Sequence, residues 1–343
     1  MERVVFAGND YLGLARDPRL AEAACRAARE HGISATSGRF FLGWSALHQQ
    51  LEADLAAFFG AEAACLLPVA YLGGLVYFHA MAERFRTVFC DEHSHANLFQ
   101  GMRAAGLEVR TYRHLDAADL ERQLAGYRGP RPIVASDGVF GISGEAAPAA
   151  ELARLSQRFE AELLIDDAHG VFALGRTGRG VGEMFGLRPN ESTVLGSMSK
   201  ALGAGGGFFV GRKALVERLQ RGSAGATPSP LPVVAACIEA LRIVQAEPER
   251  RARAAENARR MRASLASHGV GVVCDQTPIV AMALRDESEA ARLAEHFEAR
   301  GLVVRYARYP CEPRANLLRS AARACHTEED LRRFDAAAAA FFS

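Results

Sequence analysis

Short apolar runs alternate with amphipathic stretches over the first two thirds of the chain. Seven runs have the length and character of buried strands, at residues 63–67, 87–90, 108–112, 132–136, 162–166, 193–196 and 207–210. Helical patterns separate most of them, at residues 47–59, 72–83, 96–105 and 149–159. Because strands that alternate with helices form parallel sheets covered on both faces, the pattern predicts an α/β domain with a mostly parallel, seven-stranded sheet.

The pattern changes after residue 230. Two long helical patterns follow each other at residues 233–246 and 248–268, and the second is placed to lead into a smaller α+β unit built from residues 270–343. A length of 343 residues suits one large domain and one smaller one. No repeat, low-complexity linker or heptad pattern suggests another architecture.

Composition and charge argue against several classes of partner. A net charge of +1, with basic residues scattered along the chain, gives no reason to expect a nucleic acid or an anionic membrane. The apolar stretches are too short or too interrupted for a transmembrane helix, and the first residues lack the apolar region of a signal peptide. Seven cysteines without a Cys-x-x-Cys spacing favour reduced thiols over disulfides or zinc. We therefore expect a cytoplasmic protein.

Candidate chemistry gathers around Lys200 and Asp166. Asp166 ends a predicted strand, and in open α/β sheets ligands bind at the carboxyl ends of the strands. Lys200 follows Ser197 by three residues and precedes a glycine-rich run. Pyridoxal phosphate needs an amine, an acid that holds its ring nitrogen and anchors for its phosphate. Lys200, Asp166 and the Ser197 hydroxyl with nearby backbone N–H groups could supply all three, so the pattern indicates a pyridoxal-phosphate site.

Each of these residues also has a simpler interpretation. A single lysine before glycines is usually solvated, and an aspartate at a strand end can cap a helix. The acid and histidines at Asp91, His93 and His95 could hold a metal, but further ligands are not evident nearby, so we expect no metal site. The glycines at 203–207 lack the spacing of a dinucleotide-binding loop. The joint occurrence of several further motifs favours the cofactor site.

Six segments carry a resemblance to a known family across nearly the whole chain. They are NDYLGL at 9–14, SGRFFLG at 37–43, SHA at 94–96, DDAHG at 166–170, GRG at 178–180 and SKALG at 199–203. With these segments the chain resembles the α-oxoamine synthases, pyridoxal-phosphate enzymes of fold type I. The resemblance implies a large cofactor-binding domain at residues 36–247 and a small domain at residues 248–343 that also takes up residues 1–35.

The resemblance also implies roles for individual residues around the cofactor ring. Lys200 matches the lysine that forms the Schiff base, and Asp166 matches the partner of the pyridine nitrogen. His95 matches a histidine that stacks on the ring. His169 matches a histidine near the phenolic oxygen.

The implied phosphate contacts come from several segments. Ser197 matches a phosphate-binding hydroxyl, and Ala70 with Tyr71 occupies the position of a Gly-aromatic pair. Thr227 or Ser229 could reach the phosphate of a neighbouring subunit.

For the substrate, Arg319 matches an arginine that holds an amino-acid carboxylate, and Asn9 matches an asparagine that helps it. A planar guanidinium can grip a carboxylate with two hydrogen bonds, although a surface role for Arg319 stays open at this point.

The implied activity is that of a homodimeric C-acyltransferase. It would condense an amino acid with an acyl thioester of coenzyme A or an acyl carrier protein, with decarboxylation, to an α-amino ketone. Two alternatives stay open: an aminotransferase with the same cofactor, and a catalytically weak protein that acts as a binding module. His95 and His169 favour the synthase, because aminotransferases more often carry an aromatic ring and a tyrosine at these two places.

Three departures from the family pattern bear on these expectations. Gly141 stands where a serine is usual, and Val69 replaces a polar residue near the phosphate. Only eight residues precede the NDYLGL motif, where the family has a longer arm near the substrate entrance. The amino acid and the acyl chain therefore stay unassigned.

Overall fold

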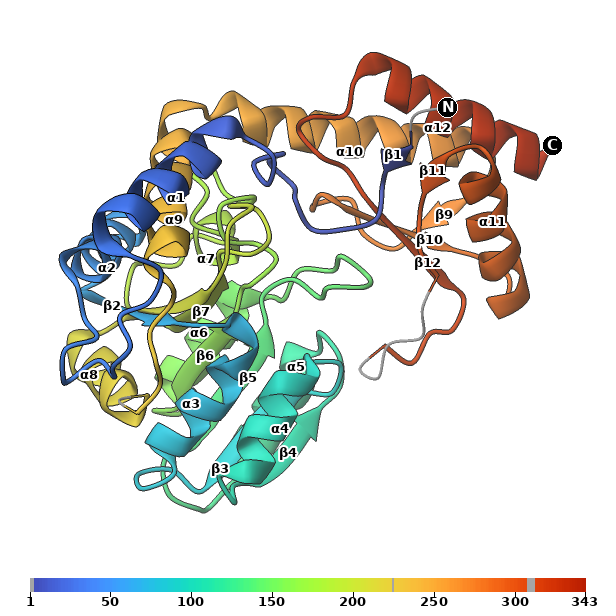
Figure 1. Cartoon of the computed structure of the whole chain (residues 1–343). Coiled ribbons are helices and arrows are strands. Elements are labelled where there is room, and N and C mark those ends of the chain that lie inside the picture. Colours follow the sequence, from blue (N-terminus) through green and yellow to red (C-terminus); the bar gives the residue numbers. More distant parts are fainter. Residues whose placement is uncertain (1–2, 224, 307–311) are drawn as a thin grey trace.

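The structure, a computed structural model, describes residues 3–223, 225–306 and 312–343 (Figure 1). Seven strands form its main sheet in the order β2-β8-β7-β6-β5-β3-β4. Their bounds are Ala63–Leu67 for β2, Thr87–Asp91 for β3, Glu108–Tyr112 for β4, Ile133–Asp137 for β5, Glu162–Asp166 for β6, Thr193–Ser197 for β7 and Gly207–Gly211 for β8. All seven predicted strands are confirmed, and their ends differ from the predicted ones by at most one residue.

One strand departs from the parallel pattern. Strand β8 is antiparallel to both of its neighbours, β2 and β7, whereas the other pairs are parallel. The chain passes from β7 to β8 through residues 198–206 alone. Because a parallel crossover needs a dozen or more residues, this short connection requires antiparallel pairing.

Helices cover both faces of the sheet, and the side chains of successive strand residues pack against opposite helical layers. In β3, Val88 and Cys90 pack in the layer that contains residues of α3, α4 and α8, while Phe89 packs with those of α2, α5, α6 and α9. The helices are α2 Ala46–Phe59, α3 Gly73–Met81, α4 Ala96–Ala104, α5 Ala117–Gly126, α6 Ala149–Arg158, α7 Val181–Met184, α8 Lys213–Gly222 and α9 Leu231–Ala246. The predicted helix at 72–83 is divided into a 3-10 turn η1, Ala70–Leu72, and α3.

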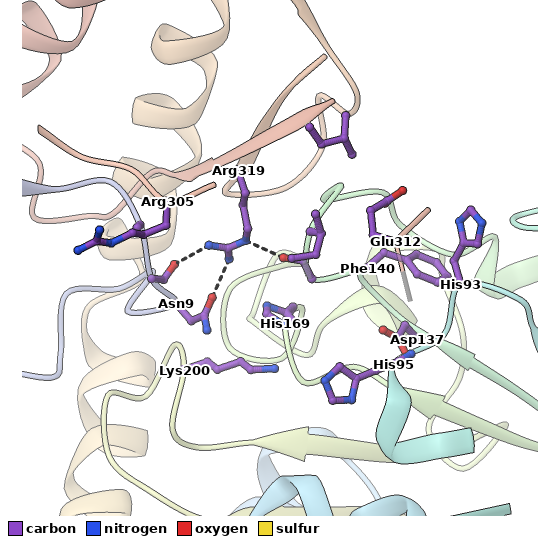
Figure 2. A pocket seen from close by; sticks show the side chains of 15 residues that line it. Asn9, His93, His95, Asp137, Phe140, His169, Lys200, Arg305, Glu312 and Arg319 are labelled. Atoms are coloured by element: carbon purple, nitrogen blue, oxygen red, sulfur yellow. Dashed lines mark hydrogen bonds between the residues drawn. The ribbon is translucent and has the colours of Figure 1, made fainter. Parts of the chain in front are cut away.

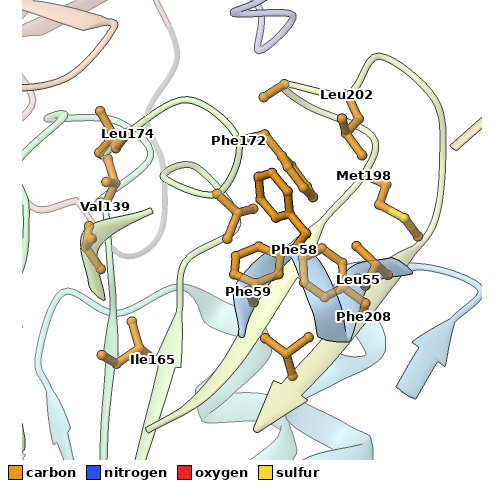
Figure 3. Packing of buried hydrophobic residues seen from close by; sticks show 14 of the residues in the cluster. Leu55, Phe58, Phe59, Val139, Ile165, Phe172, Leu174, Met198, Leu202 and Phe208 are labelled. Carbon is orange, nitrogen blue, oxygen red and sulfur yellow. The ribbon is translucent and has the colours of Figure 1, made fainter. Parts of the chain in front are cut away.

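Aromatic side chains join α2 to the main sheet (Figure 3). The ring of Phe59 lies 5.4 Å from Phe208 in β8 and 5.7 Å from Phe172 in the loop after β6. All three side chains are buried, and removing one such ring typically costs about 3–5 kcal/mol. This cluster holds the loop after β6 against the sheet.

A second, smaller sheet with its own apolar cluster follows α10, Glu249–Ser267. Strands β9 Gly271–Val272, β10 Ile279–Ala283 and β12 Leu317–Ala321 are antiparallel, in the order β12-β10-β9. Residues of α10, α11 Glu287–Ala299 and α12 Glu328–Phe342 pack in this cluster. Figure 1 shows the long α10 leading from the large sheet to this unit. None of the described helices is both long and apolar enough to span a bilayer.

The first residues of the chain contact both units. Strand β1, Val4–Val5, pairs with β11, Leu302–Val303, beside the small sheet. Helix α1, Pro18–His31, instead packs along α9 of the large unit. The proposed domain boundaries, with residues 1–35 assigned to the small domain, stay a prediction, and the packing of α1 does not follow that assignment.

Candidate active site

Two adjoining cavities lie at the carboxyl ends of β5, β6 and β7. The larger, about 410 Å³, extends toward residues 7–9 and strand β12 (Figure 2). The smaller, about 210 Å³, extends toward η1 and Ser197. Four side chains line both cavities: His95, Asp137, His169 and Lys200. The structure thus brings together residues that lie far apart in the sequence.

Lys200 lies in the short connection between β7 and β8 and points into the cavities (Figure 2). Burial lowers the pKa of its amine to about 8, although Asp166 and Asp137 nearby favour the charged form. A useful share of the amine is therefore neutral near pH 7, which a nucleophilic lysine requires.

Two carboxylates end neighbouring strands at the same level, because Asp137 and Asp166 are paired in register. Asp166 accepts hydrogen bonds from Nδ2 of Asn97 at 3.0 Å and from the backbone N–H of Ala168 at 3.2 Å. Burial and the charge of Asp166 raise the pKa of Asp137 well above its usual range. Asp137 can therefore hold a proton beside the carboxylate of Asp166.

Asp167 follows Asp166 but its carboxylate is directed elsewhere. It lines neither cavity, and its Oδ2 accepts the backbone N–H of Val181 at 2.8 Å. A Cβ at Gly170 or Gly180 would overlap this carboxylate, so the surrounding glycine-rich loop is packed directly against it. Of the two neighbouring aspartates, only Asp166 faces the site.

His95 stands at the start of α4, where its own backbone N–H donates to Asp137 at 2.9 Å. Its ring accepts the backbone N–H of Asn97 at 3.2 Å. The ring of Tyr71 meets it edge-on, with the two centroids 5.8 Å apart. His95 is therefore held between the sheet edge and η1.

The far side of the smaller cavity suits a phosphate. The hydroxyls of Ser197 and Ser199 lie 2.9 Å apart, and η1 with Ala70 and Tyr71 begins without a side-chain cap. A Cβ at Gly207 would overlap the backbone of Ala70, so this glycine allows η1 to lie directly on β8. Hydroxyls beside uncapped backbone N–H groups are a common anion-binding arrangement.

Arg319, in β12, lies across the larger cavity, and its hydrogen-bond acceptors among the described residues are all neutral. Its Nε donates to the carbonyl of Gly141 at 2.6 Å, its Nη1 to the carbonyl of Gly8 at 3.3 Å, and its Nη2 to Oδ1 of Asn9 at 2.6 Å (Figure 2). None of the carboxylates that the structure describes forms an ion pair with it. The cation is thus held in place and lacks a negative partner.

His169 lies between Lys200 and Arg319. Its Nδ1 is 2.7 Å from the hydroxyl of Tyr11. Burial, together with the positive charges of Lys200 and Arg319, holds the pKa of His169 well below its usual range, so the imidazole is neutral.

The departure at Gly141 has a structural counterpart. A Cβ at this position would lie 2.7 Å from Nε2 of His169. A serine or alanine could therefore enter only if His169 moved. The absence of the family's usual serine matches the position that His169 takes in this protein.

Three sequence candidates, Thr227, Ser229 and Asp91, lie outside both cavities. Thr227 is exposed, and Ser229 is buried with its hydroxyl donating to the carbonyl of Leu67 at 3.4 Å. Neither lines a cavity, and their contact with a neighbouring subunit stays a prediction. Asp91 accepts the backbone N–H of His93 and contacts His114. No set of three or more His, Cys, Asp or Glu side chains in the described parts of the chain gathers as a metal site.

Four residues of the site are not singled out by the sequence: Tyr11, Asn97, Asp137 and Ser199. Asp137 could have been found, because it directly follows the predicted strand at 132–136, close to where Asp166 stands on its own strand. Tyr11 and Asn97 lie inside or beside recognised motifs. Their directions depend on tertiary contacts, and no sequence pattern reports those.

Comparisons with known proteins agree with this geometry. The sequence model of the family described as Aminotransferase class I and II matches residues 2–337. The chain is 37% identical to an 8-amino-7-oxononanoate synthase of Alkalilimnicola ehrlichii, over 96% of this chain and 85% of the relative. It is 39% identical to one of Methylococcus capsulatus, over 96% and 86%.

Solved structures show the same fold. A serine palmitoyltransferase from S. paucimobilis, with a bound PLP-myriocin aldimine, superposes with a TM-score of 0.92 at 28% identity and covers 99% of this chain and 88% of that one. The resemblance that the motifs carry is thus confirmed over nearly the whole length. The chain belongs to the aminotransferase class I and II family and, within it, to the α-oxoamine synthases.

Proposed function

We propose that the protein is a pyridoxal-phosphate-dependent C-acyltransferase. It condenses an amino acid with an acyl thioester, with decarboxylation, and forms an α-amino ketone. The observation that carries the proposal is one cavity with a half-buried lysine of lowered pKa, Lys200, on one side and a guanidinium without a described negative partner, Arg319, on the other. The names of the relatives, synthases and a palmitoyltransferase, are consistent with this chemistry.

The cavity residues fit the cofactor by their chemistry. A buried carboxylate held by Asn97 suits a ring nitrogen, and an uncapped turn beside two serine hydroxyls suits a phosphate. The residues that would hold the cofactor are Lys200, Asp166, His95, His169, Ser197, Ala70 and Tyr71. When bound, pyridoxal phosphate supplies an electron sink for charge that develops at Cα of an amino acid.

The surrounding side chains define what the protein contributes. Asn97 holds Asp166, and an ionised Asp166 favours a protonated ring nitrogen. Lys200, with a pKa of about 8, can take up a proton and return it near neutral pH. Both groups lie at the ends of buried strands or in the short turn between them, so their positions are set by the sheet.

The larger cavity suits the two substrates. Arg319, supported by Asn9, can bind the carboxylate of an amino acid with two hydrogen bonds. Phe140, Ile142 and Leu317 give the same cavity an apolar lining that suits an acyl chain. The amino acid and the acyl group can therefore meet above Lys200.

A second copy of the chain is the partner we propose. Phe41 and Leu42 are 82% and 92% exposed, on a loop held by the Arg39–Glu52 ion pair. Further exposed apolar residues, Val69, Leu72 and Leu75, lie beside the cavity residue Tyr71. Exposed apolar side chains that lie close together mark interaction surfaces. Sedimentation should show a dimer for the wild type and a weaker dimer for the double variant with Phe41→Ser and Leu42→Ser. A monomeric wild type would contradict the proposal.

The test of the activity is a panel of amino acids, each incubated with acyl-coenzyme A or with an acyl carrier protein. Released thiol and the mass of the product are recorded. We expect thiol release that depends on the amino acid. The product should be lighter by one carbon dioxide than the acylated amino acid that would form if the carboxylate were kept. If the protein instead passes an amino group to an oxo acid and never releases thiol, it is an aminotransferase. If no cofactor absorbance develops, the binding-module alternative holds.

A further inference from the structure

Three side chains form a hydrogen-bonded series from the substrate side of the cavity toward the cofactor side. Nη2 of Arg319 donates to the hydroxyl of Tyr11 at 3.3 Å, and that hydroxyl lies 2.7 Å from Nδ1 of His169. Tyr11 is completely buried, and burial raises the pKa of its hydroxyl. The hydroxyl therefore stays protonated and can donate a hydrogen bond to one of its neighbours.

The donors and acceptors around Tyr11 favour one direction for the hydrogen bond between Tyr11 and His169. A guanidinium can only donate, so the Tyr11 oxygen is the acceptor in its contact with Arg319. The phenolic proton then has two candidate acceptors: Nδ1 of His169 at 2.7 Å and Oδ1 of Asn9 at 3.4 Å. The Asn9 oxygen already accepts a hydrogen bond of 2.6 Å from Arg319. The shorter contact, to His169, is the better hydrogen bond.

Whether Nδ1 of His169 accepts or donates determines whether the other ring nitrogen, Nε2, carries the proton. A neutral imidazole carries one proton, so a ring that accepts at Nδ1 must donate at Nε2. Nε2 lies on the side of Gly141, where a Cβ would be only 2.7 Å away, and no described residue accepts a hydrogen bond from it. Gly141 thus leaves this N–H free toward the cavity that His169 shares with Lys200.

We propose that Tyr11 is a positioning residue. Its hydroxyl is oriented by Arg319, donates to Nδ1 of His169, and so keeps His169 in the neutral form that carries its proton on Nε2. This extends the proposed function, in which His169 is one of the residues that would hold the cofactor; the family resemblance implies that a histidine here would face the phenolic oxygen, a hydrogen-bond acceptor. Tyrosine is required at position 11 because phenylalanine would fill the same space but leave the histidine proton undirected.

The test compares wild type with Tyr11→Phe, both purified with cofactor and labelled with ¹⁵N-histidine. Nuclear magnetic resonance reports which ring nitrogen of His169 carries the proton, and His169→Gln identifies the signals. We expect the proton on Nε2 in wild type and a mixture of Nε2 and Nδ1 forms in Tyr11→Phe. Turnover should fall about ten-fold while the KM for the amino acid changes little, since Arg319 keeps Asn9 and the Gly141 carbonyl.

Tyr77→Phe is the matched control, because Tyr77 is also fully buried but lies in the opposite apolar layer. It should leave the His169 signals unchanged. A proton on Nδ1 in wild type, or identical His169 signals in wild type and Tyr11→Phe, would overturn the proposal. The nuclear magnetic resonance result does not depend on turnover, so a failed acyltransferase assay with the expected signals would reject the proposed function alone.

Discussion

The two sides of the site, here called its floor and its roof, differ in how their charged groups are paired. On the floor, formed by Lys200, Asp166 and Asp137, an amine lies close to two carboxyl groups. Burial lowers the pKa of Lys200, and burial with the charge of Asp166 raises the pKa of Asp137. On the roof, formed by Asn9, Tyr11 and Arg319, a guanidinium donates to oxygens that are all neutral in the described parts of the chain. The floor is therefore nearly balanced without a ligand, whereas the roof needs an anion. This difference suggests that the floor holds a resident group and the roof a substrate that comes and goes.

Removing the amine of the floor should have the largest effect. In Lys200→Ala, turnover should fall by roughly 10³-fold or more, because both cofactor attachment and proton transfer are lost. Borohydride should fix the cofactor to the Lys200 peptide of wild type, as peptide mass spectrometry can show. Lys213, the only other lysine of the chain, is the control, and attachment there would contradict the assignment.

Variants of the two neighbouring aspartates should distinguish a residue of the floor, Asp166, from a structural one, Asp167. Asp166→Asn should bind the cofactor but lose turnover by about 10²–10³-fold, because the charge opposite the ring nitrogen is removed. Asp167→Asn should keep most of the turnover, since Asp167 lines neither cavity, and should mainly lower the melting temperature. The reverse result, an active Asp166→Asn and an inactive Asp167→Asn, would mean that Asp167 is the functional carboxylate.

A change in the roof should alter binding more than chemistry. In Arg319→Ala, the KM for the amino acid should rise roughly 10²-fold, because a charged hydrogen-bonded pair is lost, while kcat changes less. The cofactor absorbance should stay as in wild type. Arg323→Ala, which removes an ion pair with Asp10 outside both cavities, is the control for general damage. Equal loss of cofactor and substrate binding in Arg319→Ala would remove the distinction between floor and roof.

The smallest expected effect is a dependence on pH. The lowered pKa of Lys200, about 8, means that the reactive neutral amine increases as pH rises toward that value. The rate at which cofactor-free protein captures pyridoxal phosphate should therefore rise about five-fold between pH 7 and pH 8 and level off above it. Stopped-flow absorbance measures this rate. A rate that keeps rising ten-fold per unit beyond pH 9 would mean that Lys200 has an ordinary lysine pKa.

The same lysine should affect stability in a defined direction. Between about pH 8 and its ordinary pKa of 10.5, the unfolded chain binds the Lys200 proton more tightly than the folded one. The contribution of Lys200 to the free energy of unfolding therefore rises with pH in that range. Below pH 8 the buried amine must be charged, and the full destabilisation remains.

The floor was easier to predict from the sequence than the roof. Asp166 ends an apolar run, and the edge of a parallel sheet is the expected place for a ligand. Lys200 and Ser197 follow from the next strand in the same way. The antiparallel direction of β8 was not predicted, although the short stretch between β7 and β8 contains the information. Tyr11 could not be assigned, since its role depends on the direction of a proton between two residues far along the chain.

The contact between Asn9 and Arg319 joins residues 310 positions apart, whereas the floor residues lie between positions 137 and 200. Domains form from the amino terminus onward during synthesis, and closing a long loop adds an entropic cost that grows slowly with length. The floor can therefore assemble while the ribosome is still translating the last third of the message. The segment that carries Asn9 is made first but waits for almost the whole chain before Arg319 arrives. Substrate recognition is thus the last property that the growing polypeptide acquires.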